Sequence, residues 1–429
     1  MIVIADEAIA KLPGRRRGGV IRFSKRDGGD VYTSVASRRS RDAVQGTLLV
    51  TKASRKATAQ SFGRRGDVVR VLLWRRTNRG SSRGQRMGAP APWEAQGFVR
   101  VRGRWRASPV QLMPARDELF SRNRGIIETD VLADRTVFVA GLGSAGGFCT
   151  LELAKVGANL ILNDFDRLEP GNVSRHVLGL SDVGRYKTKA MADAVRERNP
   201  YASVETLEAK ISGETIEALR AAVRKSDVVV AAVDEREARG ILNKVCYDER
   251  KPLIVAGASH RACVVQVLRL RPGVTACYQC FLSALPRDER DEGTLGEEEA
   301  IEQAYTNRPV PPEPGLSVDI AQVSLMAVKL AIQELLQGKP SALHTLDDDL
   351  TARWYMLVNR RGVGTDYERL ESLGFGTDGF RILRWYGIPL ERDPECPCCG
   401  RYAEALARSE GIEITDEMRT AFRREGGAQ

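Results

Sequence analysis

The sequence has few histidines and no long apolar run. It contains three histidines in 429 residues, and residues 1–115 contain none, which excludes HxH-type metalloprotease chemistry from that part. No run of about 18 apolar residues occurs, so no membrane-spanning helix is predicted. The first residues lack the order of charged, apolar and small residues that marks a signal peptide, and we therefore expect a cytoplasmic protein.

The positive charge is concentrated in the N-terminal part of the chain. The formal net charge is +10, yet residues 1–125 carry 28 Lys and Arg against 9 Asp and Glu, and the remainder carries 38 against 47. Such a basic surface can bind an acidic partner or nucleic acid. A solvated, arginine-rich surface would have the same composition.

Residues 1–115 are predicted to form a small β-rich or α+β domain. Short β-like runs, at 66–74 and 95–105, are separated by stretches rich in Gly, Ser and Arg, and a mobile loop is expected near 77–92. The region also lacks cysteine, so it offers few metal ligands or general bases. We expect it to recognise a substrate or partner, with residues 116–134 as a connector.

From residue 135 to the end of the chain, a different organisation is expected. The runs TVFVA, NLILND, DVVVAAVD and KPLIVAGAS are typical of strands, and helical stretches such as FCTLELAKVG and KTKAMADAVRERN alternate with them. This alternation predicts an α/β domain of Rossmann-like type, with a doubly wound, mostly parallel sheet over 135–429. The run at 321–336 predicts a long helix with a buried apolar face.

A glycine-rich turn lies between the first strand and helix of this domain. Gly141, Gly143 and Gly146 have GxGxxG spacing, which permits a tight turn and brings phosphates close to a helix N-terminus. Asp164 follows 23 residues after Gly141, where a ribose-binding carboxylate is expected. NAD-dependent dehydrogenases share these features, so the glycine turn alone does not identify the nucleotide.

Five further polar residues favour ATP over NAD. ATP requires a ligand for Mg²⁺ and cations that offset the charge of departing pyrophosphate, and the candidates are Asp166, Asn172, Arg175, Lys187 and Asp234. All of them except Asn172 also have a structural interpretation. The first acid could cap a turn, the two cations could be solvated, and the last acid could be the N-cap of the following helix.

These motifs together resemble the ThiF/MoeB/HesA family of adenylating enzymes, which includes the ubiquitin-activating enzymes. The resemblance covers about 120–340 and the cysteines near 396, through the runs DFDRLEPGNVSRH, YKTKA, NPYASVE, DVVVAAVDEREAR and NKVCYDERKPLI. It implies an ATP-dependent adenylyltransferase that activates the C-terminal carboxylate of a ubiquitin-like or sulfur-carrier protein and releases pyrophosphate. It also implies that Asp164 binds the ribose and that the five polar residues bind phosphates and magnesium.

The resemblance further implies a homodimer in which an arginine is donated across the interface. Arg122 and Arg124 in FSRNRGII match that segment, although Gly125 stands where the family has Gln, and His176 follows Arg175 where the family often has Gln. The ubiquitin-activating enzymes carry a nucleophilic cysteine in a segment that corresponds to 281–318, which has no cysteine here. We expect this acidic segment to form a mobile loop over the substrate tail.

Four of the eight cysteines form two CxxC pairs. Cys277 and Cys280 form the first and Cys396 and Cys399 the second, with 115 residues between the pairs. Four thiolates suffice for a closed, structural Zn²⁺ site, and the resemblance places such pairs around the last part of the adenylation domain. The alternative is a set of buried free thiols.

The other cysteines have weaker functional interpretations. Cys398 could replace a zinc ligand or remain free, and Cys246 and Cys263 are expected in the core. Cys149 lies in the first helical turn after the glycines, where the helix dipole could lower its pKa, although simple packing is the commoner role.

Three functions remain open at this point. The first is activation of a carrier protein. The second is adenylation of a peptide or a tRNA base, as in microcin-type and tRNA-modifying relatives, which the basic N-terminal part leaves possible. The third is a non-catalytic nucleotide-binding scaffold, which the complete set of phosphate-binding residues disfavours.

Overall fold

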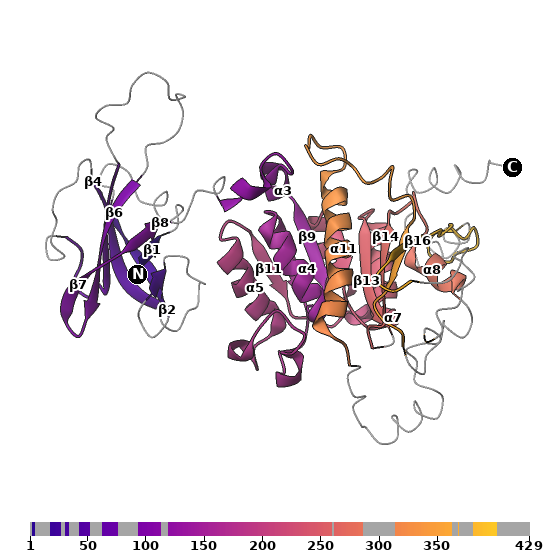
Figure 1. Cartoon of the computed structure of the whole chain (residues 1–429), viewed down its shortest axis with the longest axis horizontal. Helices are drawn as coiled ribbons and strands as arrows, with labels where there is room; N and C mark the ends of the chain where they lie inside the picture. The colour runs from indigo at the N-terminus through magenta and orange to yellow at the C-terminus, as the bar shows by residue number, and fades with distance from the viewer. Residues whose placement is uncertain are drawn as a thin grey trace. The chain divides into compact units, whose positions relative to one another are not determined.

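The computed structural model describes residues 2–4, 18–26, 31–33, 43–51, 62–75, 93–112, 119–259, 261–285, 314–362, 368 and 381–400. The chain divides into two compact units, Met1–Arg122 and Asn123–Gln429 (Figure 1). The mobile loop predicted near 77–92, and most of the loop predicted at 281–318, lie outside the described residues.

The first unit contains an eight-stranded mixed sheet, which confirms the predicted N-terminal β-rich domain. Its strands are β1 (Ile2–Ile4), β2 (Gly18–Arg26), β3 (Val31–Thr33), β4 (Ala43–Thr51), β5 (Val69–Arg75), β6 (Trp93–Val101), β7 (Arg104–Ser108) and β8 (Val110–Leu112). They lie in the order β7-β6-β5-β4-β2-β3-β1-β8. Only Pro109 separates the two edge strands in the chain, so the sheet must curl to bring its edges together.

Alternating apolar residues build the core of this unit. Val69, Val71 and Leu73 of β5 are fully buried, because every second side chain of a strand points to the same face. The run at 95–105, read as one β-like segment, is instead a hairpin. Arg102 and Gly103 both have positive φ, at 48° and 79°, and turn the chain from β6 into β7.

The second unit confirms the predicted doubly wound α/β fold. Its strands are β9 (Thr136–Ala140), β10 (Asn159–Asn163), β11 (Val204–Leu207), β12 (Val228–Ala231), β13 (Leu253–Ser259), β14 (Val264–Leu270), β15 (Trp354–Val358) and β16 (Trp385–Ile388). The order is β11-β10-β9-β12-β13-β14-β15-β16. The strands from β11 to β13 in that order are parallel, and β14 to β16 continue the sheet in antiparallel pairings.

Helices cover both faces of this sheet. They are α3 (Thr129–Ala133), α4 (Ser144–Lys155), α5 (Lys187–Arg198), α6 (Ile216–Lys225), α7 (Arg236–Asp248), α8 (Tyr278–Ala284) and α11 (Ser317–Leu336). Helices α4, α5 and α11 pack on one face, where α4 and α11 lie side by side (Figure 1), and α6, α7 and α8 pack on the other. In the described part of the chain, no helix has the length and apolarity needed to cross a membrane.

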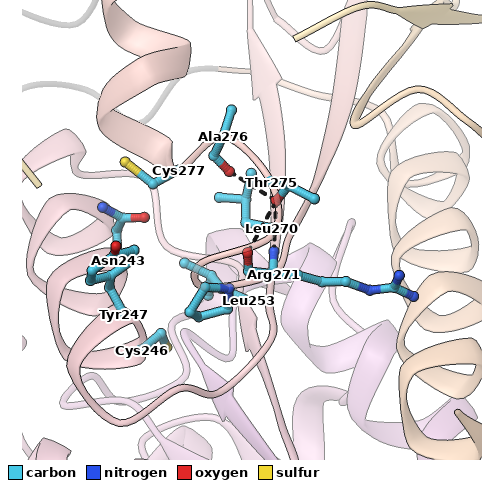
Figure 2. Close-up of a pocket in the computed structure, with 10 residues that line it drawn as sticks. Asn243, Cys246, Tyr247, Leu253, Leu270, Arg271, Thr275, Ala276 and Cys277 are labelled. Atoms are coloured by element: carbon cyan, nitrogen blue, oxygen red, sulfur yellow. Dashed lines mark hydrogen bonds between the residues drawn. The ribbon is translucent and has the colours of Figure 1, made fainter. Parts of the chain in front are cut away.

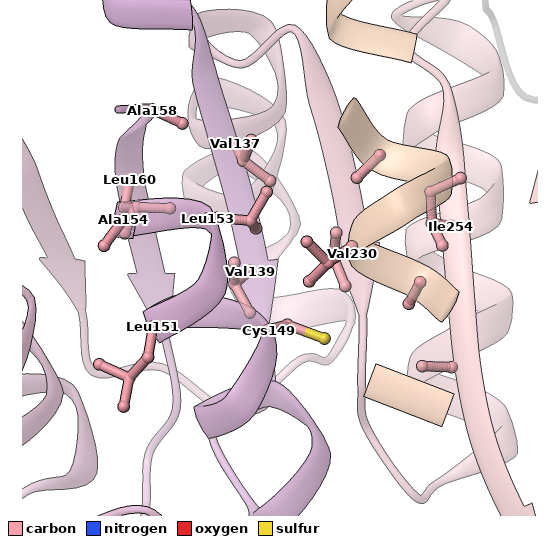
Figure 3. Close-up of a cluster of buried hydrophobic side chains, with 14 of the residues drawn as sticks. Val137, Val139, Cys149, Leu151, Leu153, Ala154, Ala158, Leu160, Val230 and Ile254 are labelled. Carbon is pink, nitrogen blue, oxygen red and sulfur yellow. The ribbon is translucent and has the colours of Figure 1, made fainter. Parts of the chain in front are cut away.

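The two faces explain why TVFVA is apolar throughout. Val137 and Val139 point to the α4 side, where Figure 3 shows them near Leu153, and Phe138 packs on the opposite side. Cys149 belongs to the first of these cores and is fully buried. Burial raises the pKa of its thiol to about 12, so the idea of a thiol activated by the helix dipole is wrong and the packing role holds.

The strand order creates a crevice beside β9. From β9 the chain builds β10 and β11 on one side and then crosses to β12 and β13 on the other. Connections that leave neighbouring parallel strands in opposite directions open a crevice at the carboxyl ends of those strands. The crevice therefore lies where β9 leads into the glycine turn and β12 leads into Asp234.

Candidate active site

The glycine turn joins β9 to α4 and packs against the end of β12. Gly141 has a φ of +83°, and a Cβ atom there would lie 2.6 Å from the carbonyl oxygen of Ala232. A Cβ atom at Gly146 would lie 1.8 Å from the oxygen of Gly141. Within the described part of the chain, Gly143, the N-cap of α4, has no non-neighbouring atom within 4 Å of its Cβ position. Two of the glycines therefore allow the turn to pack, and the third leaves the backbone at the helix N-terminus open to a ligand.

Asp164, directly after β10, holds the glycine turn from one side. Its Oδ2 accepts a hydrogen bond of 2.7 Å from the N–H of Leu142, and its Oδ1 accepts one of 2.8 Å from the N–H of Asp166. Burial raises the pKa of this carboxyl group, an effect that the charge of Lys187 and the two N–H donors oppose. Asp164 thus joins the ends of β9 and β10.

Lys187 lies beside two carboxylates. Its Nζ is 2.8 Å from Oδ2 of Asp166 and 4.0 Å from Oδ1 of Asp164. Lys187 is buried and is the first residue of α5, a position that the helix dipole makes unfavourable for a cation. The two carboxylates offset this cost. Because 47% of the Asp166 side chain is exposed, this ion pair is open to a ligand.

Arg175 and Asn172 lie on the segment after β10. Asn172 ends the short 3-10 helix η4 (Pro170–Asn172), and its Oδ1 accepts a hydrogen bond of 3.1 Å from the N–H of Glu169. That contact is a local cap. Arg175 is half-buried, and its Nη1 lies 3.7 Å from the Cβ position of Gly315, just before α11. Arg175 therefore lies beside Gly315, close to where the described chain resumes after residues 286–313.

Asp234 is exposed on the loop between β12 and α7. The N-cap of α7 is Glu235 and not Asp234, so the capping alternative for Asp234 does not hold. Asp234 therefore lies at the carboxyl end of β12, the strand whose end faces the glycine turn.

Within one chain, Arg124 lies far from the glycine turn. It is exposed in the turn after η3 (Ser121–Asn123), and Asn123 of that helix donates a hydrogen bond of 3.4 Å to the carbonyl of Lys155. Lys155 ends α4, and the glycine turn lies at the other end of this helix. The 12 residues of α4 separate the two ends by about 18 Å.

Two residues near the crevice, Arg239 and His176, make contacts that the sequence did not predict. Arg239 of α7 donates from Nε to the carbonyl of Val233 at 2.9 Å, and its Nη2 lies 3.2 Å from the Cβ position of Gly257. A glycine inside a strand was the available hint, because it permits such a close approach. His176, which the sequence shows only as the residue after Arg175, contacts the glycine turn directly, since its Nε2 is 2.7 Å from the carbonyl oxygen of Leu142.

The fold brings the four paired cysteines together. The Sγ atoms of Cys277, Cys280, Cys396 and Cys399 all lie within 4.8 Å of one another, and three of the pairs are separated by 3.8, 3.6 and 3.3 Å. Zn–S bonds of about 2.3 Å in a tetrahedron place sulfurs about 3.8 Å apart. The cluster is therefore the right size for Zn²⁺. Its thiols also interact with one another, and hydrogen bonding between Cys277 and Cys280 raises the pKa of the first and lowers that of the second.

The backbone around the cluster supports this arrangement. The N–H of Asp393 points to Sγ of Cys280 at 3.4 Å, as is common around metal-bound sulfur. Gly400 permits the second turn to close, because a Cβ atom there would lie 2.5 Å from the N atom of Cys396. A metal at this site would thus link α8 to residues far along the chain.

The fifth cysteine of this region lies outside the cluster of four. Cys398 is partly exposed, and its Sγ accepts a hydrogen bond of 3.2 Å from Asn243 of α7. Asn243 also accepts one of 2.9 Å from the N–H of Tyr278, the first residue of α8. Figure 2 shows Asn243 and Tyr247 lining a small pocket with Cys277. Asn243 therefore ties α7 to both turns that carry the thiols.

The chain is similar to several known proteins. It is 29% identical over 215 residues to the uncharacterized protein y4oA of Sinorhizobium fredii, covering 47% of this chain and 36% of that protein. It is 29% identical over 184 residues to Ubiquitin-like modifier-activating enzyme 5 of Caenorhabditis briggsae, covering 41% of this chain and 43% of that protein. The matched region thus spans less than half the length of these curated relatives.

Among solved structures, the chain is similar to the Microcin C7 biosynthetic enzyme MccB in complex with N-formylated MccA. The sequence identity is 20%, the TM-score is 0.48, and the match covers 67% of this chain and 77% of that chain.

The family match covers the crevice described above. Residues 119–353, more than half of the chain, match the ThiF family, and this range contains the glycine turn, both carboxylates beside Lys187, Arg175 and Asp234. The family predicted from the motifs is therefore confirmed: the chain belongs to the ThiF family.

Proposed function

We propose that the protein is an ATP-dependent adenylyltransferase that activates a carboxylate. The observation that carries this proposal is the position of Lys187 between Asp164 and Asp166, beside the open N-terminus of α4 in the sheet crevice. An NAD-dependent dehydrogenase needs a single ribose-binding acid here. A second acid paired with a buried lysine suits a triphosphate and its magnesium ion.

In the proposed reaction, an oxygen of the substrate carboxylate attacks the α-phosphorus of ATP. The new bond joins that oxygen to phosphorus, the bond from the α-phosphorus to the bridging oxygen breaks, and pyrophosphate leaves with that oxygen. The backbone at Gly143 and the cations of Lys187 and Arg175 stabilise the phosphate charges, and Asp164 holds the ribose. Asp166 and Asp234 would hold Mg²⁺, which neutralises phosphate charge when bound. Asn172 would help them to bind the phosphates and the ion.

We propose that the carboxylate is the C-terminus of a ubiquitin-like or sulfur-carrier protein. The similarity to enzymes named Ubiquitin-like modifier-activating enzyme 5 supports this substrate class. Residues 281–318 contain no cysteine for a thioester, so the proposal covers formation of the acyl-adenylate and includes no thioester step. All eight cysteines lack disulfide bonds, which fits the reducing cytoplasm.

Two measurements test this proposal. Calorimetry with ATP and Mg²⁺, and separately with NAD, should show binding of ATP only. Exchange of labelled pyrophosphate into ATP should then require an acceptor, and we expect it with a carrier protein that ends in Gly-Gly. Exchange with a short peptide or a tRNA instead would replace the proposed substrate class. ATP binding without exchange for any acceptor would favour the scaffold function.

We further propose a homodimer in which Arg124 acts in the partner's site. The bond from Asn123 to Lys155 holds this segment at the end of α4 far from the glycine turn of its own chain, so a role in catalysis requires a second copy. Arg124→Ala and Asp234→Ala should each retain little exchange activity. Mixing the two variants should restore part of the activity, because one site of each mixed dimer is intact. A mixture that stays inactive, although subunits exchange, would contradict this role.

We propose that the first unit recognises the partner. In the β6–β7 hairpin, Arg100, Arg102, Arg104 and Arg106 are exposed. The two acids within the described residues 62–75 and 93–112 already have partners: Asp67 is buried and accepts a 2.8 Å hydrogen bond from Thr47, and Glu94 of β6 is half-buried and accepts one of 2.7 Å from Trp74. Replacing the four arginines with glutamine should leave ATP affinity unchanged. It should slow association with an acidic carrier about tenfold at low salt, and less at high salt. Binding of duplex DNA or tRNA at physiological salt, with an affinity above ordinary non-specific binding, would instead indicate a nucleic-acid surface.

A further inference from the structure

His176 occupies a bridging position in the crevice. It follows Arg175 in the chain, and the N–H groups of both residues donate to the carbonyl of Asn172, at 2.9 Å for His176 and 3.0 Å for Arg175. His176 is 9% exposed, and its ring lies against α4 at Gly147, where a Cβ atom would be 3.3 Å from ring atoms Cε1 and Nε2. Any movement of this ring therefore affects both the segment that carries Arg175 and the helix that follows the glycine turn.

The two ring nitrogens have opposite hydrogen-bonding roles. The N–H of Leu178 donates to Nδ1 at 3.0 Å, so Nδ1 is an acceptor and carries no proton. Nε2 lies 2.7 Å from the carbonyl oxygen of Leu142, which can only accept, so Nε2 carries the proton. Both contacts are satisfied together in one form, the neutral ring with the proton on Nε2.

Both polar groups of Leu142, in the middle of the glycine turn, are thereby fixed. Its N–H donates to Asp164 at the end of β10, and its carbonyl accepts from His176. The turn is held from two sides, and the following N–H groups at the start of α4 keep their orientation toward the crevice. A loss of either contact would free the turn to rotate.

We propose that His176 is a positioning residue for the nucleotide site, acting as a neutral ring with the proton on Nε2 that couples the Arg175 segment to the glycine turn. Protonation on Nδ1 would place two N–H donors face to face at Leu178 and would break this coupling. The site would therefore lose nucleotide affinity in acid through His176. This inference rests on the proposed function only in taking ATP as the ligand.

The surroundings of the ring favour the neutral form. Burial is the largest influence and lowers the pKa of His176, and the positive charge of Lys187 on α5 lowers it further. The hydrogen bond to Leu142 and the negative charges of Asp164 and Asp182 oppose these effects without reversing them. Because the pKa in the folded state is below that of an unfolded histidine, about 6.5, the contribution of His176 to stability is complete above that pH. It is lost as the pH falls through the lowered pKa.

A direct test uses ¹⁵N NMR on the full chain. Only three histidines occur in the sequence, so long-range ¹H–¹⁵N spectra of the ring nitrogens are simple, and His176→Gln identifies the signals of His176. We expect a ring that stays neutral at pH 6.5 with the proton on Nε2. A proton on Nδ1, or a ring half-protonated at pH 6.5 or above, would overturn the inference. This test does not depend on any activity.

A functional test compares ATP affinity between pH 5.5 and 8. His176→Gln keeps an N–H donor for Leu142 and should bind Mg²⁺–ATP within about threefold of the wild type at pH 7.5, whereas His176→Ala should bind about tenfold more weakly, the value of one hydrogen bond. The affinity ratio of wild type to His176→Gln should fall on acidification, because glutamine does not titrate. A flat ratio across a pH range in which the NMR spectra show that the His176 ring becomes protonated would contradict the inference.

The matched control is His344→Gln, because His344 is exposed and should leave the ratio unchanged. If His176→Ala does not fold, the NMR experiment and the glutamine variant still decide the question. If the wild type binds no ATP at any pH, the proposed function fails. The ring state and the pH dependence of thermal stability in wild type and His176→Gln then test His176 alone.

Discussion

The second unit contains two sites that differ in how exposed their side chains are, the crevice beside β9 and the cluster of four thiols. In the crevice, Asp166 and Asp234 are exposed, and Lys187 already has a carboxylate partner 2.8 Å away. In the cluster, the cysteines are at most 4% exposed, and their sulfurs face one another. A ligand can therefore enter and leave the crevice, whereas an ion in the cluster would be enclosed and would act as part of the fold.

The two sites also differ in how the chain builds them. The crevice uses the ends of neighbouring strands, each followed by its own helix, so every loop is anchored without a ligand. The cluster joins the start of α8 to residues 396–399, and contacts such as Cys277 to Cys396 span 119 positions of sequence. Removal of a ligand should therefore disable the crevice without unfolding it, and should loosen the fold at the cluster.

The largest effect is expected for Cys280→Ser. Loss of one thiolate should release the proposed zinc ion and lower the free energy of unfolding by about 5 kcal/mol, a fraction of the binding energy of structural zinc. Elemental analysis and thermal denaturation measure these changes, and calorimetry should show ATP affinity altered much less. Cys398→Ser is the control, because it leaves the four sulfurs in place. Freshly purified wild type without zinc would remove this claim.

A smaller effect in free energy is expected for Asp234→Ala. Pyrophosphate exchange should fall on the order of 10² to 10³-fold, as for the loss of one strong electrostatic contact in a transition state. The thermal midpoint should barely change, because substitutions of exposed residues cost within about 0.5 kcal/mol. Glu237→Ala, an exposed acid in the first turn of α7, is the matched control and should retain exchange. Unfolding of Asp234→Ala would break the contrast between the two sites.

The smallest effect separates two glycines of the same turn. Gly146→Ala should cost about 2 kcal/mol of stability, because the added methyl would lie 1.8 Å from the oxygen of Gly141. Gly143→Ala should cost about 0.5 to 1 kcal/mol, because only the change from glycine to alanine at an N-cap counts, whereas its φ of −69° suits any residue and none of the described residues outside the turn lies near its Cβ position. Chemical denaturation of both variants measures the difference, with zinc content unchanged in each. Equal stability losses would show that the turn is not packed as described.

The sequence predicted the parts of the fold that depend on local pattern. The alternation of strand-like and helical runs gave the doubly wound sheet, and the apolar run at 321–336 lies within α11. The hairpin at β6 and β7 was missed, because Arg102 stands before Gly103 in the turn, and an arginine with positive φ does not mark a turn as asparagine or a second glycine would. Exposed arginines on both strands also concealed the break between them.

Residues of the candidate site could be predicted where their spacing from a strand determines their position. The glycines, Asp164 and Asp166 stand at fixed distances after strands, so their positions at the sheet edge follow from the strand pattern. Arg239 was missed because its place depends on Gly257, which comes from another strand. The role of His176 depends on Leu142, 34 positions earlier, which no local pattern indicates.

The sequence by itself therefore determined the family, the doubly wound fold, the glycine turn and the two cysteine pairs, because each is encoded by residues close together in the chain. Only the tertiary structure decided which side chains meet across the sheet. Arg269 is fully buried on β14 and pairs with Glu334 of α11 at 2.5 Å, a contact that spans 65 positions. A buried charge is tolerated only beside its partner, and that partner is supplied by folding and not by sequence proximity.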